Sequence, residues 1–245
     1  MKKKKTTIPS IIKWVIALIL VVMQVYPFFY VFTSSFKSLD DFRQLPAYAF
    51  PSKWVLTNFI NVFTKSHMLT YFKNSIIVLI GVLIPLLLFA LMAGFALSKI
   101  KFKGRKFVLN YFLLGLMLPM QVALIPLFTI FNKMGLINTY LGMMIVFFVS
   151  AMNIFQFRQS FKTFATTLKE AAHIDGCSNF TFFLRILLPT NISTVLTVFI
   201  TAFIGTWNTY LWPLLVTNKT EMRTVQVGIT MLNFSEGTVY GPIMA

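Results

Sequence analysis

Five long apolar runs without a charged residue constrain the fold of this 245-residue chain more than any other feature. A helix that crosses the roughly 30 Å hydrocarbon core of a bilayer needs about 20 predominantly apolar residues. The chain is 57% hydrophobic and only 11% charged, which leaves too few polar residues to cover a soluble domain. We therefore expect an all-α polytopic membrane protein with five spans. The spans cover residues 14–32, 74–98, 107–132, 134–157 and 186–218.

The first run follows a lysine-rich head at residues 2–5, an arrangement that also opens secretory signals. Its apolar stretch is longer than the roughly 7 to 15 residues of a signal, and no small-residue cleavage pattern closes it. We interpret it as an uncleaved first span and place the basic N-terminus, residues 1–13, in the cytoplasm.

The basic residues support this orientation, because fourteen fall on the cytoplasmic side and eight on the outer side of the five spans. The bias is strongest in the short loop KIKFKGRK at 99–106, where the positive-inside rule is most reliable. A net charge of +16 suggests nucleic acid as a partner of a soluble protein, but here the basic residues only interrupt apolar runs. One cysteine and two distant histidines offer neither a disulfide framework nor a metal site.

The cytoplasmic segment between spans four and five, residues 158–185, has helical periodicity. Phe161, Phe164, Leu168 and Ala171 or Ala172 recur every three to four residues, which predicts one helix with these side chains on a single face.

Gly176 is expected to end this helix in the left-handed conformation, and Ser178 or Asn179 to cap a second short helix that carries Phe180 and Phe183 on one face. From periodicity alone, the segment fits an interfacial loop, an internal brace or a docking element. Two of the six acidic residues of the chain lie within EAAHIDGC at 170–177, where small residues permit the close approach of a partner.

The same segment resembles a family motif. Glu-Ala-Ala, three residues, Gly, nine residues, Ile, one residue and Leu-Pro is similar to the EAA motif of the membrane subunits of bacterial ABC importers. Four further segments resemble the carbohydrate-uptake branch of this family, which includes the maltose and glycerol-phosphate permeases. They are IDG at 174–176, FIGTWNTYLWPLLV at 203–216, RTVQVGI at 223–229 and GLINTYLGMM at 135–144.

The resemblance implies a permease domain at 14–245 whose coupling loop, 158–189, docks on a separate ATPase subunit. Glu170 is implied as the ion-pair partner of that subunit, Ala171 and Ala172 as the site of close approach, and Gly176 as the turn. The implied docking residues are Glu170, Ala171, Ala172, Asp175, Gly176, Ile186, Leu188 and Pro189.

The resemblance also implies the other components of the transporter. These are a second permease subunit, two ATPase subunits and an extracytoplasmic solute-binding protein, assembled at the bacterial cell membrane. ATP and magnesium belong to the ATPase, because this chain has no GxxxxGK[ST] loop. We expect a transport subunit without catalytic residues, metal or a cofactor of its own.

The chain departs from the family pattern in three places. Ser193 stands where many relatives have proline, and Asn208 stands where many have aspartate. Family members usually have six spans, and GTVYGPIMA at the end of the chain is too short for a sixth, which we expect to be truncated.

Polar residues within the spans are candidates for the substrate pathway: Gln24, Gln121, Asn153, Gln156, Trp207 and Asn208. The alternative is that these amides bind neighbouring helices. The predicted function is inward transport of a sugar by alternating access. A glycerol-phosphate importer is the first alternative. A stand-alone secondary transporter is the second, disfavoured because no span contains an acidic residue.

Overall fold

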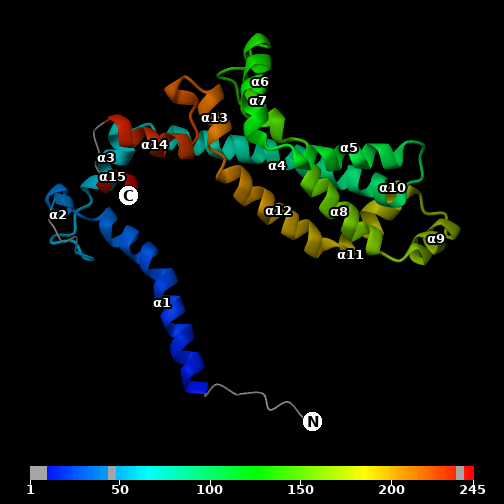
Figure 1. Ribbon diagram of the computed structural model, residues 1–245, viewed down its shortest axis with the longest axis horizontal. Helices are drawn as coiled ribbons and strands as arrows, with labels where there is room; N and C mark the ends of the chain where they lie inside the picture. The colour runs from blue at the N-terminus through cyan, green and yellow to red at the C-terminus, as the bar shows by residue number, and fades with distance from the viewer. Residues whose placement is uncertain (1–9, 44–47, 236–239) are drawn as a thin grey trace. The chain divides into compact units, whose positions relative to one another are not determined.

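The structure, a computed structural model, describes residues 10–43, 48–235 and 240–245. All regular elements of these residues are helices, which confirms the all-α prediction (Figure 1). The chain divides into two compact units, each described here by itself. Unit 1 comprises Met1–Met68 and Gly228–Ala245, and unit 2 comprises Leu69–Val227.

Unit 1 begins with helix α1, Ser10–Ser35. Its segment Ile12–Ser35 is long and apolar enough to cross a membrane, with a mean hydropathy of 2.3 over its most apolar 18 residues. Most of its side chains are exposed within the chain itself, and Pro27 lies inside the helix without ending it. The apolar run at 14–32 therefore forms one continuous helix, as predicted.

A folded segment follows α1. Ser38 and Asp41 exchange hydrogen bonds at the start of α2, Leu39–Arg43, in the reciprocal pattern of a capping box. The Val55 amide donates to the Phe36 carbonyl at 3.0 Å and closes the segment on itself. The segment that follows α1 is therefore held by its own hydrogen bonds. The remaining helices of this region are α3, Thr57–Lys65, and α15, Tyr240–Met244.

Unit 2 is organised around α4, Met68–Lys99, a continuous helix of 32 residues with a mean hydropathy of 3.1 over its most apolar window. Two apolar clusters lie along it. One surrounds Val82, Met143 and Trp212, and the other surrounds Phe157 and Phe182. The other helical elements of the chain are α5 Arg105–Met117, α6 Met120–Lys133, α7 Tyr140–Met144, η1 Ile145–Phe147, α8 Ala151–Thr163, α9 Thr166–Ile174, α10 Asn179–Phe182, η2 Phe183–Leu187, α11 Leu188–Thr190, α12 Ile192–Trp207, α13 Leu211–Val216, η3 Thr220–Met222 and α14 Val225–Ser235.

The last three predicted spans are not single straight helices. The helix pair α5 and α6 bends by 100°, the pair Tyr140–Phe147 and α8 by 41°, and the pair Asn179–Thr190 and α12 by 79°. The described residues thus contain two continuous helices that fit a membrane, or up to five spans if each bent pair crosses once.

The structure corrects three of the predicted spans. The run 107–132 breaks at Leu118, whose extended backbone (ψ 116°) precedes Pro119. The run 134–157 becomes helical only at Tyr140, and α8 continues beyond its predicted end to Thr163. The run 186–218 is interrupted at Asn191 and again at Asn208, because α12 ends at Trp207.

Candidate functional site

The loop between α8 and α12 holds the residues that resemble the EAA motif. Helix α9 carries the Glu-Ala-Ala triplet and ends in a Schellman motif. The Gly176 amide donates to the His173 carbonyl at 3.1 Å, and the Cys177 amide donates to the Ala172 carbonyl at 2.9 Å. Gly176 adopts a φ of 80°, so the predicted glycine turn is confirmed.

The second short helix of the loop also forms as expected. The Ser178 hydroxyl accepts a hydrogen bond from the Thr181 amide at 3.1 Å and caps α10. Phe183 then begins η2, a short π-helical stretch, and it packs at 4.9 Å, centroid to centroid, against Phe95 of α4. Phe180 and Phe183 lie 6.5 Å apart, but only Phe183 is buried. Phe183, directly after this second helix, therefore anchors it on α4.

The first part of the loop differs from the prediction. A single helix through Phe161, Phe164 and Leu168 is wrong, because Phe164 is extended (φ −65°, ψ 133°) and separates α8 from α9. Phe161 is buried, the ring of Phe164 packs edge-on against Phe182 at 5.9 Å, and Leu168 is 54% exposed. Because of this break, the side chains of α9 do not continue the buried face of α8.

The docking residues implied by the resemblance fall into two groups. Ala172 is buried in the cluster around Phe157 and Phe182, and Ile186 and Leu188 are half-buried against the same cluster. Exposed are Glu170, Ala171, Asp175, Gly176 and Pro189. Within the described residues Glu170 makes no ion pair. The loop thus has one side that packs against the rest of unit 2 and an exposed side with two carboxylates that make no ion pair within the described residues.

Three apolar side chains of the loop are exposed, which the sequence pattern did not indicate. Ile174 is 87% exposed, and Leu168 and Phe180 are also well exposed. Periodicity placed Leu168 on one face with Phe161 and Phe164, since it assumed one unbroken helix. The extended backbone at Phe164 breaks that helix, and Leu168 is exposed on α9.

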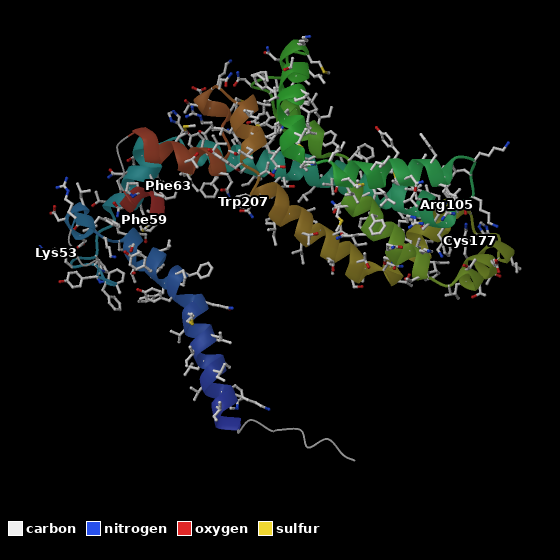
Figure 2. The ribbon with its side chains drawn as sticks, in the orientation of Figure 1. Lys53, Phe59, Phe63, Arg105, Cys177 and Trp207 are labelled. Atoms are coloured by element: carbon white, nitrogen blue, oxygen red, sulfur yellow. The ribbon has the colours of Figure 1, made fainter. Side chains whose placement is uncertain are left out.

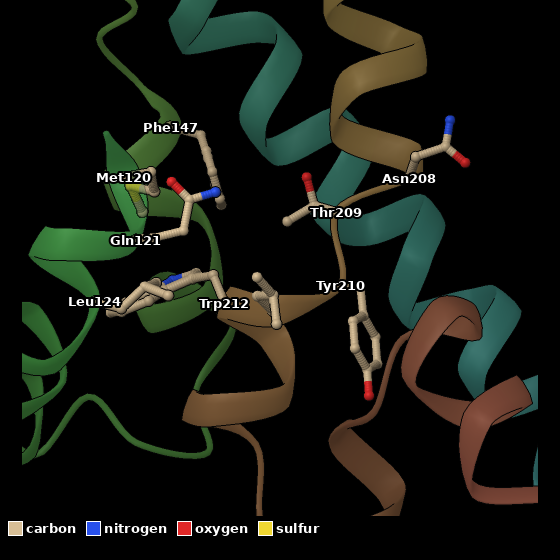
Figure 3. Close-up of a pocket in the computed structure, with 9 residues that line it drawn as sticks. Met120, Gln121, Leu124, Phe147, Asn208, Thr209, Tyr210 and Trp212 are labelled. Atoms are coloured by element: carbon tan, nitrogen blue, oxygen red, sulfur yellow. The ribbon is translucent and has the colours of Figure 1, made fainter. Parts of the chain in front are cut away.

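Five of the six predicted pathway residues line cavities of unit 2. Gln121 and Asn208 line a cavity of about 280 Å³ that also includes Tyr210 and Trp212 (Figure 3). Asn153 and Gln156 line a second cavity of about 420 Å³. The structure therefore groups four of the six predicted residues in pairs.

The other two predicted residues have different surroundings. Trp207 borders a small cavity with Ser75, and its ring stacks on Phe203 with 6.4 Å between centroids. Gln24 is exposed on α1, in unit 1. Figure 2 labels Trp207, at the end of α12.

Two residues that the sequence did not single out line all three cavities. Phe147, at the end of η1, and Thr209, just after α12, are common to their linings. Figure 3 shows Gln121 and Thr209 directed toward each other, while the amide of Asn208 points away. Thr209 lies in the polar sequence TWNT at 206–209, from which only Trp207 and Asn208 were selected as candidates.

None of the residues that line these three cavities carries a charge. Their polar groups are amides and hydroxyls, and their apolar groups include the aromatic rings of Phe147, Tyr210 and Trp212. Such a surface can hydrogen-bond hydroxyl groups and pack against the faces of sugar rings, but it offers no fixed countercharge to an ion.

The family described as Binding-protein-dependent transport system inner membrane component matches residues 86–245. This range includes the loop and every residue that lines the three cavities apart from Ser75 and Val78. The chain belongs to this family. It is 32% identical to the arabinooligosaccharides transport system permease protein AraQ of Halalkalibacterium halodurans, over 99% of this chain and 88% of that protein. It is 29% identical to the sn-glycerol-3-phosphate transport system permease protein UgpE of Rhizobium meliloti, over 96% and 86%.

A solved structure shares the fold of this permease. The crystal structure of a bacterial ABC transporter involved in the import of the acidic polysaccharide alginate contains a chain that superposes with a TM-score of 0.84. The match covers 100% of this chain and 92% of that chain, at 21% sequence identity. The predicted architecture of an ABC-importer permease is confirmed.

Membership in the permease family confirms a transport subunit, and the family description places it in the inner membrane. A binding-protein-dependent ABC importer works as a complex, so an ATPase and a solute-binding protein are implied as its companions.

Proposed function

We propose that this chain is a permease subunit that moves a neutral saccharide into the cell. The uncharged lining of the three cavities carries this proposal. A phosphate group in a protein site is usually held by arginine, lysine or a cluster of backbone amides. Amides, hydroxyls and aromatic rings instead suit a solute rich in hydroxyl groups.

Relatives with different substrates define the competing proposal. AraQ is named for arabinooligosaccharides and UgpE for sn-glycerol-3-phosphate. The absence of a cation among the cavity residues favours the first class for this chain, since a dianionic phosphate would lose its hydration there without an opposite charge.

The loop supplies the proposed link to ATP hydrolysis. Glu170 and Asp175 are exposed near Ala171, so a basic groove on an ATPase can reach both carboxylates. In this proposal ATP-driven closure of two ATPase subunits displaces α9 and alternates the access of the cavities. The ATPase subunits bind the ATP and magnesium.

The remaining parts of the proposal concern assembly and orientation. A second, similar permease subunit completes the pathway, and the solute-binding protein approaches from the outer side. The basic segment 1–13 lies in the cytoplasm, together with the loop 158–189, in accord with the distribution of basic residues.

Substrate class is tested with the complete transporter in proteoliposomes, supplied with its solute-binding protein. Neutral oligosaccharides are expected to stimulate ATP hydrolysis and to accumulate, whereas glycerol 3-phosphate is not. Gln121→Leu and Gln156→Leu remove cavity amides and are expected to reduce uptake, and Gln159→Leu, at an exposed glutamine of α8 that lines none of the three cavities, is the matched control. Stimulation by glycerol 3-phosphate alone contradicts the proposed substrate.

Docking is tested by charge reversal. Glu170→Lys is expected to weaken ATPase binding by more than tenfold, since loss of one partner of a buried charge pair costs about 2 to 5 kcal/mol. Glu221→Lys, at another exposed acidic residue, is the control and is expected to retain the ATPase. Equal copurification of the ATPase with both variants rules out docking through Glu170.

A further inference from the structure

Two lysines connect the loop to the end of α4 by reciprocal hydrogen bonds. The Lys169 ammonium of α9 donates to the backbone carbonyl of Lys99 at 2.6 Å. The Lys99 ammonium, at the last residue of α4, donates to the backbone carbonyl of Phe164 at 2.7 Å. Phe164 is the extended residue between α8 and α9, so each lysine binds the chain near the other.

The carbonyl groups at the end of α4 need such donors. The last carbonyls of a helix have no intrahelical partner, and cations are favoured there by the helix dipole. Arg105 donates to the carbonyls of Ser98 and Ile100 at 3.1 and 3.4 Å, and Lys169 donates to the carbonyl between them. Three consecutive carbonyls are therefore bound by two cations, of which only Lys169 comes from α9.

The two lysines are held close to other cations. Burial and, after it, repulsion from Lys101 lower the pKa of Lys169. No acidic side chain in the described part of the chain pairs with Lys99 or Lys169. The contact is thus made through backbone carbonyls and depends on the position of α4 itself.

Helix α9 has few other attachments. It has nine residues, no side-chain hydrogen bond at its N-cap Ala165, and one buried side chain, Ala172. A helix of this length is not stable in isolation, so tertiary contacts must hold it. Helix α4 in turn lines the cavity of Asn153 through Leu86 and extends along both apolar clusters of unit 2. The contact between Lys169 and Lys99 therefore links α9 directly to α4, a helix that lines the cavity.

We propose that Lys169 is a positioning residue that makes α9 and the end of α4 move together, so that a displacement of α9 by the ATPase reaches the solute cavity through α4. This rests on the proposed docking of α9. Figure 2 labels Arg105, whose guanidinium donates to the carbonyls on either side of that of Lys99, and Cys177, which follows α9.

The experiment measures coupling with the complete transporter in proteoliposomes. Lys169→Met keeps the apolar stem and removes the donor, whereas Lys169→Arg keeps a cation with donors. Lys162→Met, at an exposed lysine near the end of α8, is the matched control. Solute uptake, ATP hydrolysis and the amount of bound ATPase are measured on each variant.

Lys169→Met is expected to retain the ATPase and its hydrolysis, while solute imported per ATP falls by about tenfold, as expected for loss of one hydrogen bond to a charged group. Lys169→Arg and Lys162→Met are expected to keep the wild-type ratio. A purely structural role would lower uptake and hydrolysis together and leave their ratio unchanged.

A second readout follows the geometry. Spin labels at the exposed positions Lys103 and Thr167, in a Cys177→Ser background, are expected to give one narrow distance distribution that broadens with Lys169→Met. An unchanged ratio and an unchanged distribution with the ATPase still bound overturn the role of Lys169 and leave the proposed function intact. Loss of the ATPase from Lys169→Met also overturns it, since Lys169 then acts in docking. Failure of the wild-type chain to bind an ATPase overturns the proposed function itself.

Discussion

Helices α4 and α8 approach closely at Gly94, and this contact leads to a quantitative prediction. A Cβ atom placed on Gly94 would lie 2.6 Å from the Cβ of Phe157, 3.1 Å from the amide nitrogen of Arg158 and 3.3 Å from the carbonyl carbon of Phe157. Ordinary van der Waals contact begins at 3.4 Å, so the first distance is short by about 0.8 Å. Small residues at helix contacts in membranes allow this kind of approach.

Gly94→Ala is therefore expected to destabilise unit 2. The backbone atoms of α8 cannot be avoided by a change of side-chain rotamer, and Phe157 is fully buried in its cluster. The two helices must separate, and overpacking of this kind costs about 1 to 3 kcal/mol. Alanine also favours a helix over glycine by about 1 kcal/mol, which offsets part of the cost.

Gly115→Ala isolates the packing contribution. Gly115 lies in α5, and a Cβ atom placed on it would have no neighbouring atom within 4 Å, so this variant gains helix propensity without a clash. The difference in unfolding free energy between the two variants then reports the contact of α4 with α8, about 1 to 3 kcal/mol in the unfavourable direction for Gly94→Ala.

The assay is thermal unfolding of the purified transporter in detergent, followed by solute uptake after reconstitution. We expect Gly94→Ala to unfold at a lower temperature than Gly115→Ala and to import solute more slowly, because α8 carries Asn153 and Gln156 of the cavity. If Gly94→Ala is as stable as Gly115→Ala, the close contact does not exist in the protein and the reasoning is refuted.

Two further predictions concern a buried indole and a buried carboxylate. Trp212→Phe removes the hydrogen bond from the Trp212 indole to the Gly142 carbonyl (3.0 Å) and is expected to cost about 1 to 3 kcal/mol in thermal unfolding, with exposed Trp14→Phe unchanged as the control. Hydrogen bonds from Ser52 and Ser38 lower the pKa of Asp41 below its ordinary 3.8, against the opposing effect of burial, so its carboxylate stabilises the outer segment at neutral pH and this stability is lost as the pH falls below about 3.8. Asp41→Asn is accordingly expected to speed proteolysis of that segment at pH 7 but not in strong acid, and equal rates at pH 7 would contradict this role.

Proline shows which parts of the fold are accessible from sequence. Hydrophobic runs predicted α1 and α4 because their length and composition alone determine a span, and Pro27 and Pro85 lie inside these helices without breaking them. Pro119 has the same chemistry in an equally apolar run, yet the chain turns by 100° there. The difference is the extended backbone of Leu118, which hydrophobicity does not encode.

The loop shows the same division between local and distant causes. Gly176 and Ser178 were predictable because a glycine turn and a serine cap act within a few residues. The break at Phe164 was not, because its carbonyl is bound by Lys99, 65 residues earlier in the chain. Periodicity reports one helix at a time and does not include a donor from another helix.

The amides of the cavities separate the two interpretations that the sequence left open. The Asn208 amide donates to the Ile204 carbonyl at 2.9 Å, and its side-chain oxygen accepts from the Gln226 amide of α14 at 3.4 Å, so both polar groups have partners and a role in helix packing is favoured. Gln156 differs, because its side-chain oxygen is buried without a hydrogen-bond partner in the described part of the chain, and the residue lines the cavity of Asn153. A buried amide oxygen without a donor is costly, and a solute hydroxyl that donates to it recovers that cost. Among the predicted pathway residues, Gln156 is therefore the strongest candidate to accept a hydrogen bond from a hydroxylated solute.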